Sequence, residues 1–381
     1  MGGSEKNEAK CETTVPQIEG RMQMSCPKCG FENPDDVHAC GSCGLELGKE
    51  TGSAETIAPR RSGLAIVALV FGVLSPLFCG LTALPAVPLA IIAIIQIELS
   101  GGRVTGRNIA IIGIVASVIT FYLLPWPILL EQRRMAFRMV CGSNLAGIGK
   151  GMLGYAADYD GQFPRSGGAD SRWAGTIENW KAPDRYAAYG LSADGAGGVG
   201  SISSSFYLLV KYAEVLPELF ICPGDRGTSV FDPADEHAGD KKLAELWDFG
   251  ARPIKRCSYS YHQPFGLYPL TKSSNPGMAI AADRNPFIRS PMAEPKNISL
   301  FVPDGGRSAI NMGNAYQHNN EGQNVLFVDS HVGFEKNPCC GVDDDNIYTF
   351  WDGGDIRRGA LPYLESASQD ESDSLLVNDG Y

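Results

Sequence analysis

Hydrophobic and polar positions divide the chain into three stretches. Residues 1–62 are polar, residues 63–130 are almost wholly apolar, and the rest has the mixture of an ordinary water-soluble domain. There is no Asp, Glu, Lys or Arg from Gly63 to Ile97 or from Asn108 to Leu130. A helix needs about 20 apolar residues to cross a bilayer. The pattern therefore predicts transmembrane helices, with the lipid bilayer as a partner.

The number of spans is open, because the first apolar stretch is too long for one simple span and is interrupted by Pro76, Gly80, Pro85 and Pro88. It makes either two short spans or one span plus an interfacial or re-entrant piece, which gives two or three spans in total. No apolar segment follows a basic start at the N-terminus, so we expect no cleaved secretion signal. We expect a multi-pass inner-membrane protein with a cytosolic N-terminus and an extracytoplasmic C-terminal domain.

An amphipathic helix is predicted directly after the last apolar stretch. Its apolar stripe recurs at spacings of three and four residues, at Cys141, Leu145, Ile148, Met152, Tyr155 and Tyr159. The helix should end near the turn signal Asp160-Gly161. Further on, Asn324–Val328 and His331–Phe334 are typical of two strands of a hairpin around an Asp-Ser turn.

Two Cys-x-x-Cys pairs lie in the polar N-terminal stretch. Cys26 and Cys29 are separated by ten residues from Cys40 and Cys43, and a glycine follows each pair. Four thiolates complete a closed tetrahedral site, and so short a segment folds mainly through metal binding. This spacing predicts a zinc ribbon with a structural Zn2+, in preference to two redox pairs or two disulfides.

Charge and missing motifs exclude several functions. The formal net charge is −11, whereas nucleic-acid binding needs a concentrated basic surface. No Gly-x-Ser-x-Gly elbow, phosphate loop or His-Glu-x-x-His helix occurs in the sequence. We therefore predict a protein that is not an enzyme, with no nucleic-acid partner and no small-molecule substrate.

The segment after the apolar block resembles bacterial pseudopilin-like proteins of the type II secretion or prepilin type. The resemblance rests on landmarks in a fixed order: Cys141-Gly142-Ser143-Asn144-Leu145, Phe220 to Asp225, Ser258 to Tyr261, Ala282 to Pro286, and His318 with Gly322 to Val332. The last landmark is similar to that family's His, nine residues, Asp-Gly signature, but has ten residues and Ser330 in place of glycine. The resemblance implies an α+β fold in which a long helix packs on an antiparallel sheet.

The apolar block also resembles a small bacterial membrane domain of unknown function. The resemblance rests on an apolar stretch, the loop Gly101-Gly102-Arg103-Val104-Thr105-Gly106-Arg107 and a second apolar stretch. The predicted organisation is therefore a disordered N-terminus (1–24), a zinc ribbon (25–47), a linker (48–62), a transmembrane domain (63–130), a pseudopilin-like domain (131–363) and an acidic disordered tail (364–381).

Three further groups are candidates for chemistry. His318, Asp329 and His331 could meet as a metal site, although the hairpin alone explains their positions. Hard oxygen ligands for calcium could come from an acidic loop, which is otherwise a solvated surface loop and comprises Asp343, Asp344, Asp345 and Asp352. Cys222 and Cys257 could form a disulfide, although the sequence leaves the connectivity open.

The leading functional hypothesis is a membrane-anchored, pseudopilin-like structural or interaction protein of the bacterial envelope. It would bind other envelope or secretion proteins, with the zinc ribbon as a cytosolic docking knob. The alternative is a metal-dependent envelope enzyme or sensor that uses His318, Asp329 and His331.

Overall fold

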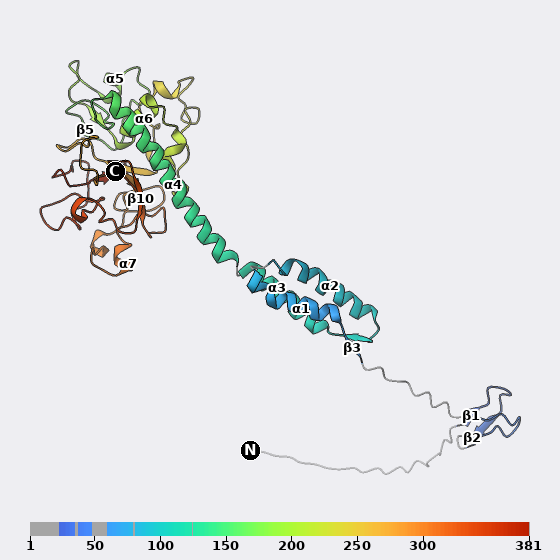
Figure 1. Ribbon diagram of the computed structural model, residues 1–381. Helices are drawn as coiled ribbons and strands as arrows, with labels where there is room; N and C mark the ends of the chain where they lie inside the picture. Colours follow the sequence, from blue (N-terminus) through green and yellow to red (C-terminus); the bar gives the residue numbers. More distant parts are fainter. Residues whose placement is uncertain (1–22, 35–36, 48–58, 79–80, 124, 381) are drawn as a thin grey trace, which may run out of the picture. The chain divides into compact units, whose positions relative to one another are not determined.

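The computed structural model describes residues 23–34, 37–47, 59–78, 81–123 and 125–380 (Figure 1). The chain splits into two compact units, one formed by residues 1–74 and 82–117 and the other by residues 75–81 and 118–381. The first unit contains the cysteine-rich segment and the apolar helices. The second contains the long helix and the C-terminal domain.

The cysteine-rich segment is built on a short antiparallel pair of strands. Strand β1 (Gln23–Ser25) pairs with β2 (Glu32–Pro34), and Met24 lies opposite Asn33. A small core of Cys26, Cys40 and Leu47 is buried beside them.

The apolar block folds into three helices that pack through small residues. They are α1 (Gly63–Leu74), α2 (Ala83–Leu99) and α3 (Arg107–Leu123). Fully buried alanines form the interior, and these are Ala65, Ala68, Ala90, Ala93 and Ala110. A side chain on Gly72 would lie 2.8 Å from the carbonyl oxygen of Gly113, so these glycines let α1 and α3 approach closely.

The glycine-rich loop between α2 and α3 also has a defined conformation. It forms β4 (Val104–Thr105), which pairs in parallel with β3 (Arg60–Arg61) just before α1. The backbone N–H of Ser62 donates to the carbonyl of Thr105 at 2.9 Å.

The prediction of transmembrane helices is wrong. No helix in the described parts of the chain combines the length and the apolar content needed to cross a membrane. A 3-10 turn at Ser75–Phe78 ends α1 after 12 residues, and α2 and α3 have 17 residues each, about 26 Å of helix against a hydrocarbon core of about 30 Å. The expected multi-pass inner-membrane localisation, with a cytosolic N-terminus and an extracytoplasmic C-terminal domain, depended on these helices and is therefore wrong as well.

The C-terminal domain is α+β with an antiparallel sheet, as predicted. Its five strands lie in the order β10-β9-β8-β7-β11, and every pair is antiparallel. The strands are β7 (Tyr259–His262), β8 (Ala279–Asp283), β9 (Gln323–Phe327), β10 (Val332–Glu335) and β11 (Leu376–Val377). The helix α4 (Pro125–Asp158) packs against β9 and β10 (Figure 1).

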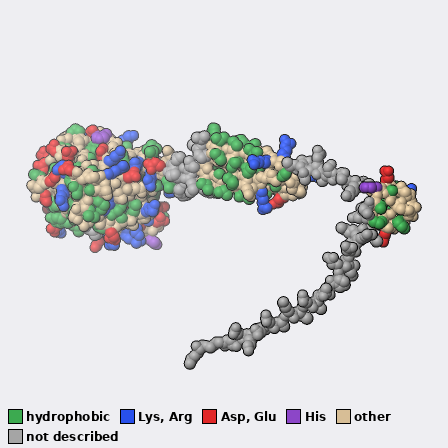
Figure 2. All heavy atoms as spheres, turned by 90° about the horizontal axis from the view of Figure 1, so that it is seen from below, with side chains coloured by type: hydrophobic (Ala, Val, Ile, Leu, Met, Phe, Trp, Pro, Cys, Tyr) green, Lys and Arg blue, Asp and Glu red, His purple; other side chains and the backbone are tan. Residues whose placement is uncertain are grey.

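Smaller elements complete this domain. They are β5 (Arg172–Trp173), β6 (Val199–Gly200), α5 (Arg185–Tyr189), α6 (Ile202–Tyr212) and α7 (Arg307–Ile310). The apolar stripe predicted for α4 is buried from Cys141 to Tyr155, and the chain turns at Asp160 and Gly161, which both have positive φ. Charged side chains of both signs are scattered over the face of this domain drawn in Figure 2, whereas hydrophobic side chains dominate the drawn face of the α1–α3 helices.

The acidic tail is not disordered. Leu375, Leu376 and Val377 are fully buried, and β11 pairs with β7 at the edge of the sheet. Asp379 is buried as well, where its carboxylate accepts hydrogen bonds from the backbone N–H groups of Ile202 and Ser203 at the start of α6. A carboxylate is stabilised at a helix N-terminus, so acidic composition did not imply solvation here.

Candidate functional site

The four ribbon cysteines come from two turns of the same backbone form. In the first turn, the N–H of Gly30 donates to the carbonyl of Cys26 at 2.9 Å, and in the second the N–H of Gly44 donates to the carbonyl of Cys40 at the same distance. Both glycines have positive φ, 72° and 69°, which a side chain would oppose. Each turn therefore aims its two thiols in one direction.

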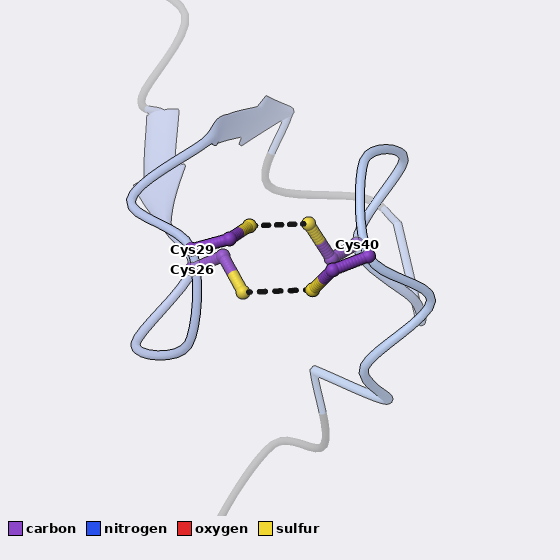
Figure 3. A group of neighbouring side chains, drawn as sticks. Cys26, Cys29 and Cys40 are labelled. Carbon is purple, nitrogen blue, oxygen red and sulfur yellow. Dashed lines mark hydrogen bonds between the residues drawn. The ribbon is translucent and has the colours of Figure 1, made fainter.

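The four sulfur atoms lie close enough together to bind one metal ion. Cys26 Sγ lies 3.7 Å from Cys43 Sγ, and Cys29 Sγ lies 3.6 Å from Cys40 Sγ, so the two turns face each other (Figure 3). With metal–sulfur bonds of about 2.3 Å, a tetrahedral ion holds neighbouring sulfurs about 3.8 Å apart. The observed separations match that edge, and a four-sulfur set leaves no open coordination position.

Backbone amides lower the pKa of two ribbon thiols. Hydrogen bonds from the backbone N–H groups at Ser42 and Cys43 bring the pKa of Cys40 down to about 6, and the N–H of Lys28 lowers that of Cys26. Thiolates are the metal-binding form of cysteine. The turns therefore favour two of the thiolates that a metal ion needs.

Asn33 joins the two cysteine turns. Its buried side chain donates to the carbonyl of Phe31 at 2.9 Å and to Cys40 Sγ at 3.6 Å, and its Oδ1 accepts from the N–H of Gly41 at 3.0 Å. Side chains that hydrogen-bond to metal ligands fix their orientation. Sequence analysis missed this residue, since a lone asparagine between two cysteine pairs carries no spacing signal.

The second predicted metal site does not form. His331 and Asp329 lie together on the exposed hairpin turn, with Nδ1 2.5 Å from Oδ1, while His318 is buried with Asp283. Within the described ranges, His318 is not grouped with Asp329 and His331 as metal ligands. The hairpin places Asp329 to cap its own turn, because its carboxylate also accepts from the backbone N–H of His331.

The acidic loop does not gather into a calcium site either. Asp343 and Asp344 are exposed, whereas Asp345 is buried and accepts from the N–H of Ser374 at 2.7 Å. Asp352 caps its own turn through the N–H of Gly354. These carboxylates do not meet as a metal group in the part of the chain that the structure describes.

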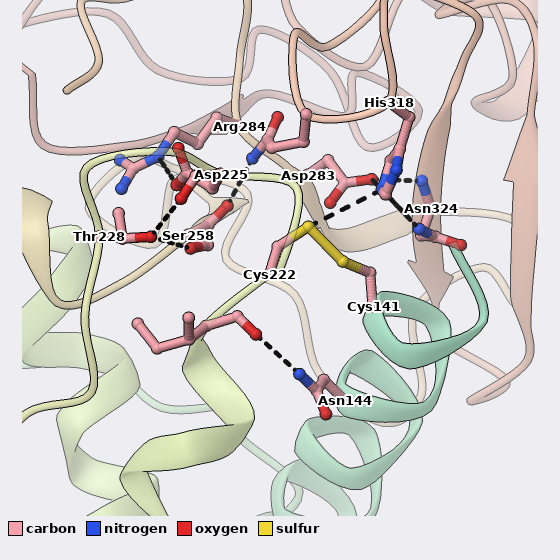
Figure 4. Close-up of a disulfide and its surroundings, with 12 residues drawn as sticks. Cys141, Asn144, Cys222, Asp225, Thr228, Ser258, Asp283, Arg284, His318 and Asn324 are labelled. Carbon is pink, nitrogen blue, oxygen red and sulfur yellow. Dashed lines mark hydrogen bonds and ion pairs between the residues drawn. A yellow bond between two sulfur atoms is a disulfide. The ribbon is translucent and has the colours of Figure 1, made fainter. Parts of the chain in front are cut away.

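Cys222 is bonded to Cys141, and the Cys222–Cys257 disulfide that the sequence left as one possibility does not form. The Cys141–Cys222 disulfide joins α4 to the loop just after the 3-10 turn Pro217–Phe220, with the Cα atoms 5.2 Å apart (Figure 4). Cys257 is a free, buried thiol, and its burial raises its pKa to about 12. The correct partner was hidden because Cys141 also belongs to the apolar stripe of the helix.

The landmarks that carry the pseudopilin resemblance meet around this disulfide. Asn144 donates to the carbonyl of Ile221 at 2.8 Å, and Arg284 forms a buried ion pair with Asp225 at 2.7 Å (Figure 4). On the other side of the disulfide lie the signature His318 and its partner Asp283. Segments far apart in the sequence thus form one buried polar centre.

Comparisons with known proteins identify one segment of the chain. The model of a domain of unknown function, DUF4190, matches residues 64–126. No curated protein and no solved structure matches the chain. The matched segment is the apolar helical block, in agreement with its predicted resemblance to a domain of unknown function. The resemblance of the C-terminal domain to pseudopilins stays a prediction.

Proposed function

We propose that this chain is a non-catalytic, pseudopilin-like interaction protein that assembles with a second copy of itself through the N-terminal half of α4. The observation that carries the proposal is the difference between the two halves of this helix. The second half is buried against the sheet. The first half presents large apolar side chains that the rest of the C-terminal domain leaves exposed.

Burial changes sharply at the middle of α4. Cys141, Leu145, Ile148 and Met152 are fully buried in the core of the domain. One turn earlier, by contrast, large apolar side chains are exposed, and these are Leu129, Leu130, Met135, Met139 and Val140. Large exposed apolar side chains gathered on one segment are typical of an interaction surface.

The charged side of this half-helix already has a partner. Arg134 and Arg138 both form ion pairs with Glu321 of the same domain, and Arg134 also pairs with Glu131. The guanidinium group of Arg138 lies 4.4 Å above the ring of Phe334. These contacts fix the rotation of the helix about its own axis.

The apolar side points away from these contacts. Successive residues of an α-helix are rotated by about 100°, which places Leu129 and Val140 opposite Arg138 and Met139 about 100° from it, so that these three side chains share one side of the helix. We call this side the outward face of α4. An apolar helical face of this kind is stabilised when it packs on another helix, and a second copy of the chain offers the same face to it.

We also propose that the ion of the N-terminal ribbon is zinc and that the ribbon is a docking module. The proposal rests on the closed four-sulfur set and on sulfur separations that fit Zn–S bonds. The exposed aromatic ring of Phe31 beside the site offers a contact surface for a partner.

Sedimentation velocity of the purified full chain tests the assembly surface. We expect the chain to self-associate with rising concentration, and Met139→Glu to weaken association at least tenfold. A buried methionine contributes about 1.5–3 kcal/mol, and about 1.4 kcal/mol corresponds to a tenfold change in affinity.

The matched control is Leu267→Glu, which changes an equally large and even more exposed side chain in a loop of the C-terminal domain. It should leave association unchanged. If the wild-type chain stays monomeric at the highest concentration reached, or if both variants weaken association equally, the outward face of α4 is not the assembly surface.

A further inference from the structure

We propose that the buried centre beside the disulfide is a second metal site, which binds Zn2+ when the Cys141–Cys222 bond is reduced. Its ligands would be the two thiolates, the Nε2 atom of His318 and a carboxylate oxygen of Asp283. The same pair of sulfur atoms would thus form a disulfide in one state and bind zinc in the other.

The four donors converge from separate parts of the chain. Cys141 is on α4, Cys222 is in the loop after the 3-10 turn Pro217–Phe220, Asp283 ends β8, and His318 precedes β9. One ligand atom of each residue lies within 4.8 Å of the others, and all four residues are buried. Two sulfurs, an imidazole nitrogen and a carboxylate oxygen are all atoms that zinc accepts.

The two separations printed for His318 are already close to the edges of a tetrahedral zinc site. With zinc bonds of about 2.0 Å to nitrogen and oxygen and about 2.3 Å to sulfur, the N–O edge is about 3.3 Å and the N–S edge about 3.6 Å. His318 Nε2 lies 3.1 Å from Asp283 Oδ2 and 3.9 Å from Cys222 Sγ (Figure 4). The sulfur–sulfur edge, about 3.8 Å around zinc, must open from the bonded distance of about 2 Å.

The polar atoms around His318 are incompletely matched in the disulfide state. Its Nε2 faces both the carboxylate of Asp283 and, at 3.1 Å, the Nδ2 donor of Asn324. One nitrogen cannot donate to the first and accept from the second at once. In addition, Asp283 Oδ1 is buried and has no hydrogen-bond partner among the described residues. A cation bound by Nε2 and the carboxylate would satisfy both groups.

Conversion of the disulfide state into the zinc state needs two electrons and two protons, which a dithiol reductant can supply. The dithiol supplies two electrons and two protons, its own sulfurs become a disulfide, and the Cys141–Cys222 bond becomes two thiols. One Zn2+ then displaces the two thiol protons to solvent as it binds the sulfurs. Asn324 donates its backbone N–H to Asp283 Oδ2 at 2.7 Å, which would hold that carboxylate in place in both states.

The test uses the full chain with the four ribbon cysteines changed to serine, so that the ribbon binds no zinc. One sample is kept oxidised, and another is reduced with dithiothreitol and desalted without oxygen. Each is incubated with Zn2+, desalted again and analysed for bound zinc by mass spectrometry. We expect about one zinc per chain in the reduced sample and none in the oxidised one.

Substitutions identify the ligands. His318→Gln should lower the affinity for zinc at least tenfold, whereas His331→Ala, which removes the exposed histidine of the hairpin, should change nothing. Tryptophan fluorescence checks that each variant is folded. As an independent readout, zinc should protect Cys141 and Cys222 of the unsubstituted site from alkylation while leaving Cys339 unprotected. Absence of zinc from the folded, reduced chain, or zinc binding that survives His318→Gln without loss, would overturn the proposal.

Discussion

The Cys141–Cys222 disulfide gives a prediction whose size follows from the structure. The two cysteines are 81 residues apart in the sequence. Closing a loop of that length removes unfolded-state entropy equivalent to about 4.5 kcal/mol at 25 °C. Replacing both cysteines by alanine should therefore lower the unfolding free energy of the C-terminal domain by about 4.5 kcal/mol, plus a smaller loss from the packing of the two sulfurs.

Urea denaturation followed by tryptophan fluorescence measures this loss, because Trp173, Trp180 and Trp247 are all buried in the domain. A metal chelator is present throughout, so that zinc binding cannot compensate in any sample. Cys257→Ala is the matched control, since it removes one buried sulfur that forms no disulfide.

The control should cost about 1 kcal/mol, the loss typical of a small change in core packing. A double variant whose loss of unfolding free energy is no more than about twice that of the control would contradict this prediction. It would mean that the covalent link adds nothing beyond the packing of its sulfurs.

Three further predictions follow from single residues. Ser330 has a φ of 68° at the hairpin turn, so Ser330→Gly should raise the unfolding free energy by about 0.5–1 kcal/mol in urea denaturation, and a loss of stability would contradict the assigned turn. Asn33→Ala should weaken zinc binding by the ribbon about 10- to 100-fold in a competition titration, whereas the exposed Glu32→Ala should not. Burial raises the pKa of Asp248 from its ordinary value of 3.8 to about 8, so folding favours the protonated carboxyl group and stability is lost as the pH rises from about 4 to about 8. Asp248→Asn should flatten that dependence in urea denaturation, and an unchanged slope would exclude this carboxyl group as its source.

Local patterns predicted the local structure well. The apolar stripe on α4 and the β9–β10 hairpin follow directly from spacings of three to four residues and of two. The two Cys-x-x-Cys pairs likewise predicted the grouping of the ribbon thiols, because the turn geometry is encoded within four residues.

Features that depend on contacts between residues far apart in the sequence could not be predicted from local patterns. The apolar block is long enough to span a bilayer when its residues are counted, but a break at Ser75–Phe78 leaves helices too short to do so. The acidic tail was misassigned because its charge is local, whereas the partner of Asp379 is the start of α6, more than a hundred residues earlier.

The buried centre shows the same limit for the candidate site. His318 was grouped with Asp329 and His331 because they are near in sequence, but its contacts are with Asp283 and Cys222. Only the packing of α4 against the sheet brings these residues together. Sequence spacing predicts ligands that one turn or hairpin supplies, and fails for ligands that tertiary packing supplies.

Site-specific photo-crosslinking in the expressing cells can detect the proposed packing of the outward face of α4 on a second copy of the chain. A photoreactive amino acid replaces Met139 on the outward face or Leu267 on the C-terminal domain, both of which are exposed. If this face is the assembly surface, position 139 should give a cross-linked band at twice the mass of the 40.8 kDa chain, and position 267 should give none. Position 139 without that band, or with the same yield as position 267, would contradict it.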